Sequence, residues 1–180
     1  MFFSICSPIL HAAEMEKPSE KTGDTVTPEQ MKMADARFLQ EAYSGTMLHV
    51  MASKYALEQV KSPEVRELAQ MLIEHHTKGL VMLEEVAVKE GVELPTDLLP
   101  PQRTMLDAAM TIKGEQFIAT YLINMTTLHV HDILQFSNTA AKSKDEDVKT
   151  FATDTMPMLK EHLVKIKAMT ATEVELKEDI

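Results

Sequence analysis

The sequence predicts an all-helical protein built around four long helices, and three observations lead to that prediction. Apolar residues recur at spacings of three and four along most of the chain, and alternation with a period of two is absent. Only five glycines are present, and the prolines cluster at candidate helix boundaries. Apolar residues make up 44% and charged residues 26% of the 180 positions, which is an ordinary balance for a globular protein. A chain of this length is therefore expected to form one domain with a substantial core.

The first two long helices begin with the same kind of start signal. Residues 27–30 read Thr-Pro-Glu-Gln, which supplies an N-cap, a proline at the first helical position and a glutamine three residues after the cap. We expect a helix from this signal to about residue 60. Residues 62–64 read Ser-Pro-Glu and repeat the signal, and the second helix should reach about residue 90, where Gly91 is suited to end it.

The second half of the chain is expected to add a short helix and two further long ones. Residues 92–101 hold three prolines, so they should form an ordered connection, and a short helix is predicted over 102–112. A third long helix is expected over 114–142, followed by a polar turn at 143–147 and a fourth helix to about residue 169. Two tight turns and one long connection are typical of a four-helix bundle, here with a short extra helix between its second and third long helices.

The ends of the chain are expected to lie outside this bundle. Residues 1–13 form an apolar run that ends in small residues, which resembles a signal peptide shortened at its positively charged start. Residues 14–27 are polar and predict a flexible leader, so the bundle is expected over 28–170 and an acidic tail over 171–180. The run is too short to span a membrane, and the mature protein should therefore begin near Glu14 and be periplasmic or secreted.

The acidic composition and the single cysteine exclude several classes of function. The formal net charge is −10, so a phosphate backbone or an anionic membrane surface would repel the protein. Nucleic acid is therefore not an expected partner, and no motif identifies a protein partner. Cys6 is the only cysteine and lies in the predicted signal peptide, so disulfides, thiolate metal sites and cysteine nucleophiles are not expected in the mature chain.

Four histidines lie one on each predicted long helix: His49, His75, His129 and His162. In antiparallel helices joined by a tight turn, residues at equal distances from the turn lie at the same height. His49 and His75 are each 13 residues from Ser62, and the midpoint of His129 and His162 falls in the last predicted turn. Each histidine lies on a face of otherwise apolar residues, so we expect all four to point inward and form one central layer.

Methionines accompany three of these histidines. Met71, Met125 and Met158 each precede the histidine of their helix by four residues, which puts thioether and imidazole on one helix face, one turn apart. This ligand pair suits copper, particularly Cu(I), and does not suit magnesium or calcium. His76 and His131 are rotated away from the inward direction by about 100° and about 200°, and we expect them at the flanks or the surface.

Two interpretations of the layer remain open. One is a metal site, most readily for copper, with the four histidines as ligands and the three methionines as auxiliary ligands. The other is a structural polar layer, in which each buried histidine hydrogen-bonds a partner and holds the core together. A di-iron centre would need Glu-x-x-His on two helices, and the chain has no such motif, so a di-iron centre is not expected. No catalytic triad and no glycine-rich phosphate loop is found, so the sequence does not indicate an enzyme.

Residues 34–169 resemble the bacterial family named domain of unknown function 4142, a ferritin-like helical family common among exported proteins. The likeness is carried by the order and spacing of six segments, at 35–42, 62–75, 91–95, 114–117, 121–129 and 156–163. The resemblance implies a ferritin-like bundle and an exported location, and it implies no established activity. The chain departs from the family at His49, where the family more often has glutamate, and this exchange removes a carboxylate from the central layer.

A shorter likeness concerns residues 71–76, which read Met-Leu-Ile-Glu-His-His. They look like the double-histidine motif of domain of unknown function 305, another ferritin-like group, linked to copper handling. Two functions are therefore predicted as alternatives. The first is an exported metal-binding protein that buffers copper, and the second is a non-catalytic envelope module that acts on a partner protein through its acidic surface.

Overall fold

A computed structural model describes residues 26–178 of the chain, with side chains described as far as residue 171 except at residue 115. This part of the chain is helical and contains no strand, so the predicted all-helical class is confirmed. The helices are α1 (Pro28–Gln59), α2 (Pro63–Glu90), α3 (Pro100–Met110), α4 (Glu115–Lys142) and α5 (Glu146–Glu178). The predicted signal peptide and most of the predicted leader lie outside the described residues.

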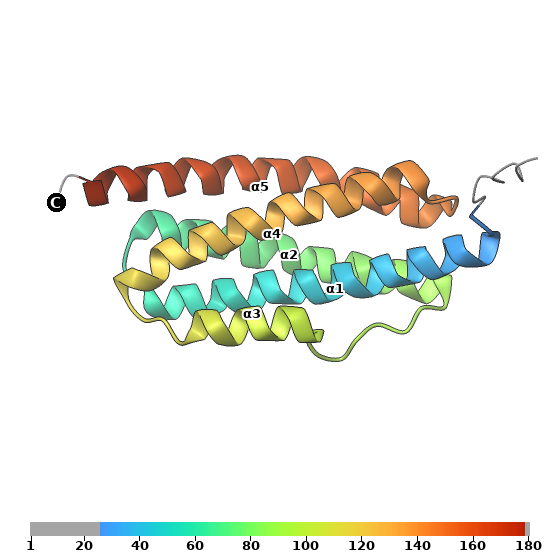
Figure 1. Cartoon of the computed structure of the whole chain (residues 1–180), viewed down its shortest axis with the longest axis horizontal. Helices are drawn as coiled ribbons and strands as arrows, with labels where there is room; N and C mark the ends of the chain where they lie inside the picture. Colours follow the sequence, from blue (N-terminus) through green and yellow to red (C-terminus); the bar gives the residue numbers. More distant parts are fainter. Residues whose placement is uncertain (1–25, 179–180) are drawn as a thin grey trace, which may run out of the picture.

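The four long helices pack side by side, with the short helix α3 against α1 (Figure 1). Helices α1 and α2 form one antiparallel hairpin, and α4 and α5 form the other, with their tight turns at opposite ends of the molecule. The long connection after α2 leads to α3, which lies outside the four long helices. Each long helix therefore has two long neighbours, in the cyclic order α1, α2, α5, α4.

The helix ends confirm the capping signals read from the sequence. The Thr27 hydroxyl accepts from the backbone N–H of Gln30 at 3.2 Å, and the Gln30 side chain accepts from the Thr27 N–H at 2.8 Å. Ser62 caps α2 in the same manner, through the backbone N–H of Val65. Gly91 ends α2 with φ 65°, a left-handed conformation that glycine adopts without steric cost.

Two helix boundaries differ from those predicted. Helix α3 begins at Pro100 instead of residue 102, because proline has its φ fixed near the helical value and needs no hydrogen-bond acceptor at a helix start. Helix α5 continues to Glu178, beyond the predicted end near residue 169. Residues 170–178 contain neither glycine nor proline, so the backbone meets no helix breaker there.

The apolar core is divided into two clusters, one toward each end of the long helices. The first contains Leu48, Tyr55, Leu72, Phe117, Leu122 and Ile166 among others, and the second contains Phe38, Leu39, Leu83, Phe136, Phe151 and Leu159 among others. On α2, α4 and α5 the sequence passes from one cluster to the other at a buried histidine, which is His76, His129 or His162, and on α1 the buried His49 directly follows Leu48, near the edge of the first cluster. A layer of imidazoles therefore separates the two apolar clusters at the middle of the molecule.

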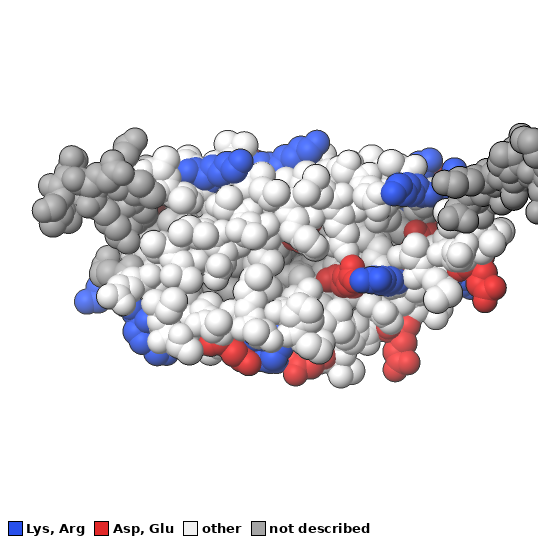
Figure 2. All heavy atoms as spheres, viewed as in Figure 1, with Lys and Arg blue, Asp and Glu red and all other residues white. Residues whose placement is uncertain are grey.

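The outer face of α4 carries few charges, as the space-filling view shows over the middle of this side of the molecule (Figure 2). Between residues 116 and 141, Asp132 is the only aspartate, glutamate, lysine or arginine. Its side chain is only 14% exposed, so this lone carboxylate is not an ordinary solvated surface charge.

No described helix is both long enough and apolar enough to cross a membrane.

Candidate metal centre

Five histidines meet in the central layer, from four different helices. They are His49 of α1, His75 and His76 of α2, His129 of α4 and His162 of α5. The side chains of His49, His129 and His162 are fully buried, His76 is 2% exposed, and His75 is partly exposed. The structure thus brings together all four histidines predicted to form the layer.

Three of the imidazoles form a compact inner group. The rings of His49 and His76 are stacked, with centroids 4.2 Å apart and planes inclined by 15°. The centroid of His129 lies 4.5 Å from that of His49 and 5.4 Å from that of His76. One ring nitrogen from each of the three lies within 4.8 Å of the others. A metal holds each imidazole nitrogen at about 2.0–2.1 Å, so these nitrogens would have to move closer together, and the stacked rings of His49 and His76 would have to turn, to share one ion.

The hydrogen-bond partner of His49 selects the tautomer of its ring. His49 Nε2 lies 2.8 Å from Asp132 Oδ2, and an ionised carboxylate only accepts, so Nε2 carries the proton and donates it. His49 Nδ1 therefore keeps its lone pair. This Nδ1 atom is buried and has no hydrogen-bond partner among the described residues. A carboxylate that orients a histidine in this way is a usual companion of histidine metal ligands.

The tautomer of His129 is also selected by an acceptor. Its Nδ1–H donates to the backbone carbonyl of Met125 at 2.8 Å, which leaves the lone pair on Nε2. His129 Nε2 in turn accepts from Nδ1–H of His162 at 3.3 Å, and His162 Nε2 accepts from Nδ1–H of His75 at 2.8 Å. The three rings form one chain of hydrogen bonds with a single direction, running from the partly exposed His75 to the buried His129.

His76 is predicted from the sequence to lie at the flank or the surface, and this prediction is wrong. The ring is 2% exposed, and its Nε2 atom has no hydrogen-bond partner among the described residues. Helix α2 packs between α1 and α5, so its inward face is wide enough for two adjacent histidines. The spacing of Ala69, Leu72, His76 and Leu83 contained the signal, because steps of three, four and seven follow one helix face.

Asp132 is a member of the site that the sequence analysis did not identify. Its Oδ1 atom lies 3.5 Å from Nδ1 of His131, a residue of the surface whose side chain is 67% exposed, as predicted. Burial acts to raise the pKa of the Asp132 carboxyl, but its interactions with His131 and His49 outweigh burial and hold that pKa well below its ordinary value. The signal for Asp132 was its isolation, as the only charged residue in a long apolar helix segment.

Three imidazoles of the layer, those of His76, His129 and His162, are neutral near pH 7. Burial lowers the pKa of His129 to about 3, and it lowers the pKa of His162 to about 4. Burial also lowers the pKa of His76 well below its ordinary value, and the surrounding imidazoles lower it further. A metal binds the deprotonated nitrogen, so the layer presents its ligand atoms in the form that binding requires.

A small cavity lies beside the inner group. Its volume is about 20 Å³, enough for a single water-sized occupant, and its lining includes His76, Asp132, Met158 and Thr46. Met158, one of the predicted methionines, therefore shares this cavity with a ring and a carboxylate of the layer.

The other two predicted methionines lie elsewhere around the layer. Met125 is 1% exposed and belongs to the core, where its carbonyl accepts from His129. Met71 lies where α2 meets α5, and its sulfur accepts from Lys165 Nζ at 3.4 Å. The three methionines thus surround the histidine layer at separate positions.

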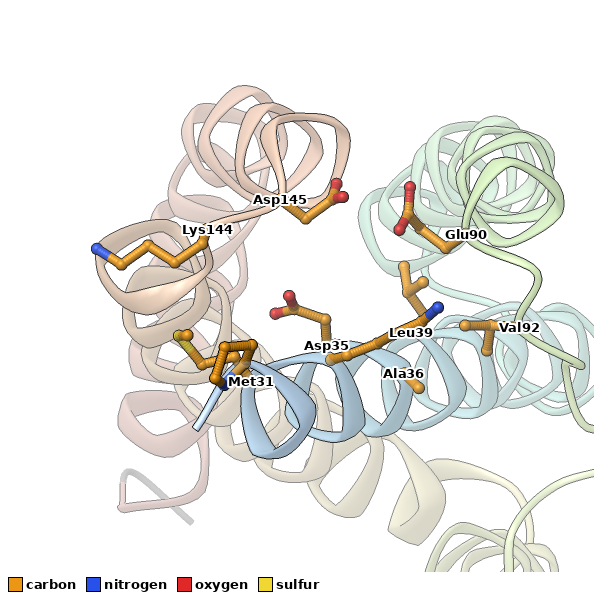
Figure 3. Close-up of a pocket in the computed structure, with 10 residues that line it drawn as sticks. Met31, Asp35, Ala36, Leu39, Glu90, Val92, Lys144 and Asp145 are labelled. Atoms are coloured by element: carbon orange, nitrogen blue, oxygen red, sulfur yellow. The ribbon is translucent and has the colours of Figure 1, made fainter. Parts of the chain in front are cut away.

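A second group of potential ligands lies at one end of the molecule, away from this layer. Glu90, Asp145 and Asp147 place carboxylate oxygens within 4.8 Å of one another, and the side chains of Asp35, Glu90 and Asp145 border the same hollow (Figure 3). Burial raises the pKa of Glu90, and the nearby Asp145 raises it further. Asp147 is exposed and forms an ion pair with Lys89 at 2.6 Å. Partly exposed carboxylates with such partners are common at protein surfaces, so we assign them no binding role.

The family described as "Domain of unknown function (DUF4142)" matches residues 20–169 of the chain. The search of curated proteins found no match to the chain. Among solved structures, the chain is similar to one described as "CopM in the Cu(II)-bound form", with a TM-score of 0.64. The two are 15% identical, and the similarity covers 77% of this chain and 96% of that chain. At this level of identity the similarity shows a shared fold and nothing further.

Proposed function

Because the chain belongs to the family named domain of unknown function 4142, whose name states no activity, we propose a function from the central layer: the protein binds copper. The observation that carries the proposal is that His49 Nδ1 and His76 Nε2 are buried without a hydrogen-bond partner among the described residues. A buried polar atom without a partner is costly, and a bound ion would satisfy both atoms. His129 Nε2 would join them as a third ligand by exchanging its long hydrogen bond from His162, at 3.3 Å, for the ion.

The ligand chemistry favours copper over other ions. Imidazole suits zinc, copper, iron and nickel, whereas thioether favours copper, especially Cu(I). In our proposal His49, His76 and His129 are the inner ligands. His162 lies next to them, and Met158 is an auxiliary ligand across the small cavity. The copper-bound state named for the structural relative agrees with this choice.

The remaining predicted residues have outer or supporting roles in this proposal. His75 and Met71 lie at the outer edge of the layer, and Met125 orients His129 through its carbonyl. A di-iron centre uses two Glu-x-x-His motifs, and the chain has none. The carboxylate of the layer is Asp132, and it is hydrogen-bonded to the ring of His49. We therefore propose copper binding and not di-iron chemistry.

We further propose that the fold is a ferritin-like four-helix bundle over residues 28–170, with α3 as the extra helix of its long connection. The proposed role is that of a periplasmic or secreted protein that buffers copper. The signal peptide expected over residues 1–13 supports that location. We propose no enzymatic activity.

A non-catalytic interaction module with a structural polar layer is the alternative, and one observation favours it. The chain formed by His75, His162 and His129 has its internal hydrogen bonds made without any ion. Such a chain could hold helices α2, α4 and α5 in register as a purely structural element. The unpartnered atoms of His49 and His76 are what this alternative leaves unexplained.

Metal loading of the purified protein tests the two functions. We expect the protein to retain about one equivalent of copper after dialysis, to release it to a strong chelator, and to gain thermal stability on binding. His76→Leu and His129→Leu should each lower the retained copper, while Met82→Leu, a change at an exposed methionine of α2, should not. A wild-type protein that retains no copper, or variants that retain as much as wild type, would exclude the proposed site.

A further inference from the structure

The histidine layer reaches the solvent along the line where helices α2 and α5 pack together, here called the α2–α5 seam. His75 of α2 is partly exposed, whereas His162 of α5 is fully buried behind it. Their ring planes are inclined by only 17° and their centroids are 5.1 Å apart, so the rings lie edge to edge on either side of the hydrogen bond that joins them. His75 is therefore the outermost ring of the hydrogen-bonded chain that ends at His129.

The direction of this chain determines which atom of His75 is available. Its Nδ1–H is engaged with His162 Nε2 at 2.8 Å, so the lone pair of the ring is on Nε2. The two nitrogens point to different sides of an imidazole ring, so Nε2 is directed away from His162. His75 thus presents an unprotonated ligand nitrogen on the outer side of the layer.

A thioether lies on the same helix face as this nitrogen. Met71 precedes His75 by one turn of α2, which places the two side chains as neighbours along the seam. The Met71 sulfur accepts from Lys165 Nζ at 3.4 Å, and Lys165 also forms an ion pair with Glu161 at 2.8 Å. Lys165 is 47% exposed, so its ammonium can leave the sulfur without being buried elsewhere.

We propose that Met71 Sδ and His75 Nε2 form an outer, solvent-accessible Cu(I) position, from which the ion passes His162 to the inner histidines. One thioether and one imidazole are a soft ligand pair, which suits Cu(I). The inference rests on the proposed copper binding and adds the route by which the ion reaches the buried group. Lys165 competes with the ion, because its ammonium contacts the same sulfur and repels a cation bound there.

The opposite edge of the layer offers a less suitable route for Cu(I). There the exposed ring of His131 contacts Asp132, whose other oxygen is bonded to His49. A carboxylate oxygen is a hard ligand, and this one already holds an inner ring in place. A His131→Gln variant therefore tests this alternative route.

Transfer kinetics test the proposal. Cu(I) would be supplied as its bicinchoninate complex without oxygen, and its loss to the full-length protein followed by absorbance. We expect Met71→Leu and His75→Gln to slow transfer about tenfold, the lower limit for losing one residue that supports a metal site. Lys165→Gln should accelerate transfer about fivefold, since a unit charge about 4 Å away in water is worth that factor.

Matched substitutions control for effects unrelated to the seam. Met82→Leu changes an exposed methionine of the same helix, and Lys167→Gln removes a lysine from an exposed position of α5. Neither of these two variants should alter the transfer rate. The final amount of bound copper should stay at the wild-type level in Met71→Leu and Lys165→Gln, because the inner group is intact in both.

The outcomes separate this inference from the function on which it rests. A wild-type protein that takes up no copper overturns both. Normal uptake with unchanged rates in the Met71, His75 and Lys165 variants overturns the outer position alone. Slower uptake in His131→Gln with an unchanged rate in His75→Gln would place the route at the opposite edge of the layer and overturn the proposal. Faster uptake in Lys165→Gln is a gain that misfolding would not produce, so it supports the outer position independently of the two losses.

Discussion

Replacement of Asp132 by asparagine tests whether a carboxylate selects the ligand atom of His49. In the native protein the carboxylate can only accept from His49 Nε2–H, at 2.8 Å, so Nδ1 keeps its lone pair. Asparagine has nearly the same shape but can also donate from its amide nitrogen. The ring can then carry its proton on Nδ1, which blocks the proposed ligand atom. Asp132→Asn therefore changes the tautomer while leaving the packing nearly intact.

The magnitude follows from the type of hydrogen bond that is lost. A bond to a charged group contributes about 1.5–3 kcal/mol and a neutral one about 0.5–1.5 kcal/mol, so the metal-free protein should lose about 1 kcal/mol of stability. The metal affinity should fall more, by about tenfold to a hundredfold, which is the usual effect of losing a partner that orients a ligand. Asp132→Leu should lower both quantities further, because it leaves the buried Nε2–H without an acceptor.

Two measurements on the same variants check these expectations. Urea denaturation of the metal-free protein gives the stability change, and competition with a chromophoric Cu(I) chelator gives the affinity change. Asp154→Asn removes a carboxylate from an exposed position of α5 and should change neither. If Asp132→Asn binds copper as tightly as wild type while remaining folded, the assignment of His49 Nδ1 as a ligand atom is wrong.

Two further predictions concern the metal-free protein. In the unfolded chain His129 and His162 should titrate near their ordinary value of 6.5, whereas burial lowers the folded pKa values to about 3 and about 4. The unfolded state therefore binds more protons between these values, and the free energy of unfolding should fall as pH drops from about 6.5 to about 4, by at most about 1.4 kcal/mol per pH unit for each histidine. Urea denaturation at several pH values measures this slope. His129→Leu should reduce it, and an unchanged slope would contradict the assignment. Gly91→Ala should cost about 1–2 kcal/mol, because residue 91 has φ 65°. Gly79→Ala should instead stabilise by up to about 1 kcal/mol, since Gly79 lies inside helix α2 and its added Cβ would meet Thr46 Cγ2 of α1 at 3.7 Å, an ordinary van der Waals contact. Thermal denaturation of the two glycine variants should show shifts of opposite sign.

The sequence determined the helices and the height of the histidine layer, because both depend on local rules. Caps at Thr27 and Ser62 and the glycine at 91 fix where the first two long helices begin and end, through hydrogen bonds that span only a few residues. The constant rise per residue then places His49 level with His75 once a tight turn joins their helices. No tertiary information is needed for either result.

The tertiary structure decided which side chains complete the layer. His76 is inside because α2 packs between two helices, and the rotation of α2 about its own axis exposes two adjacent positions to the interior. Asp132 meets His49 across 83 residues of sequence, from a different hairpin. Such a contact depends on how the two hairpins dock, which no local pattern encodes. The height of a residue along a helix follows from counting, but its direction and its partner depend on the packing of the helices around it.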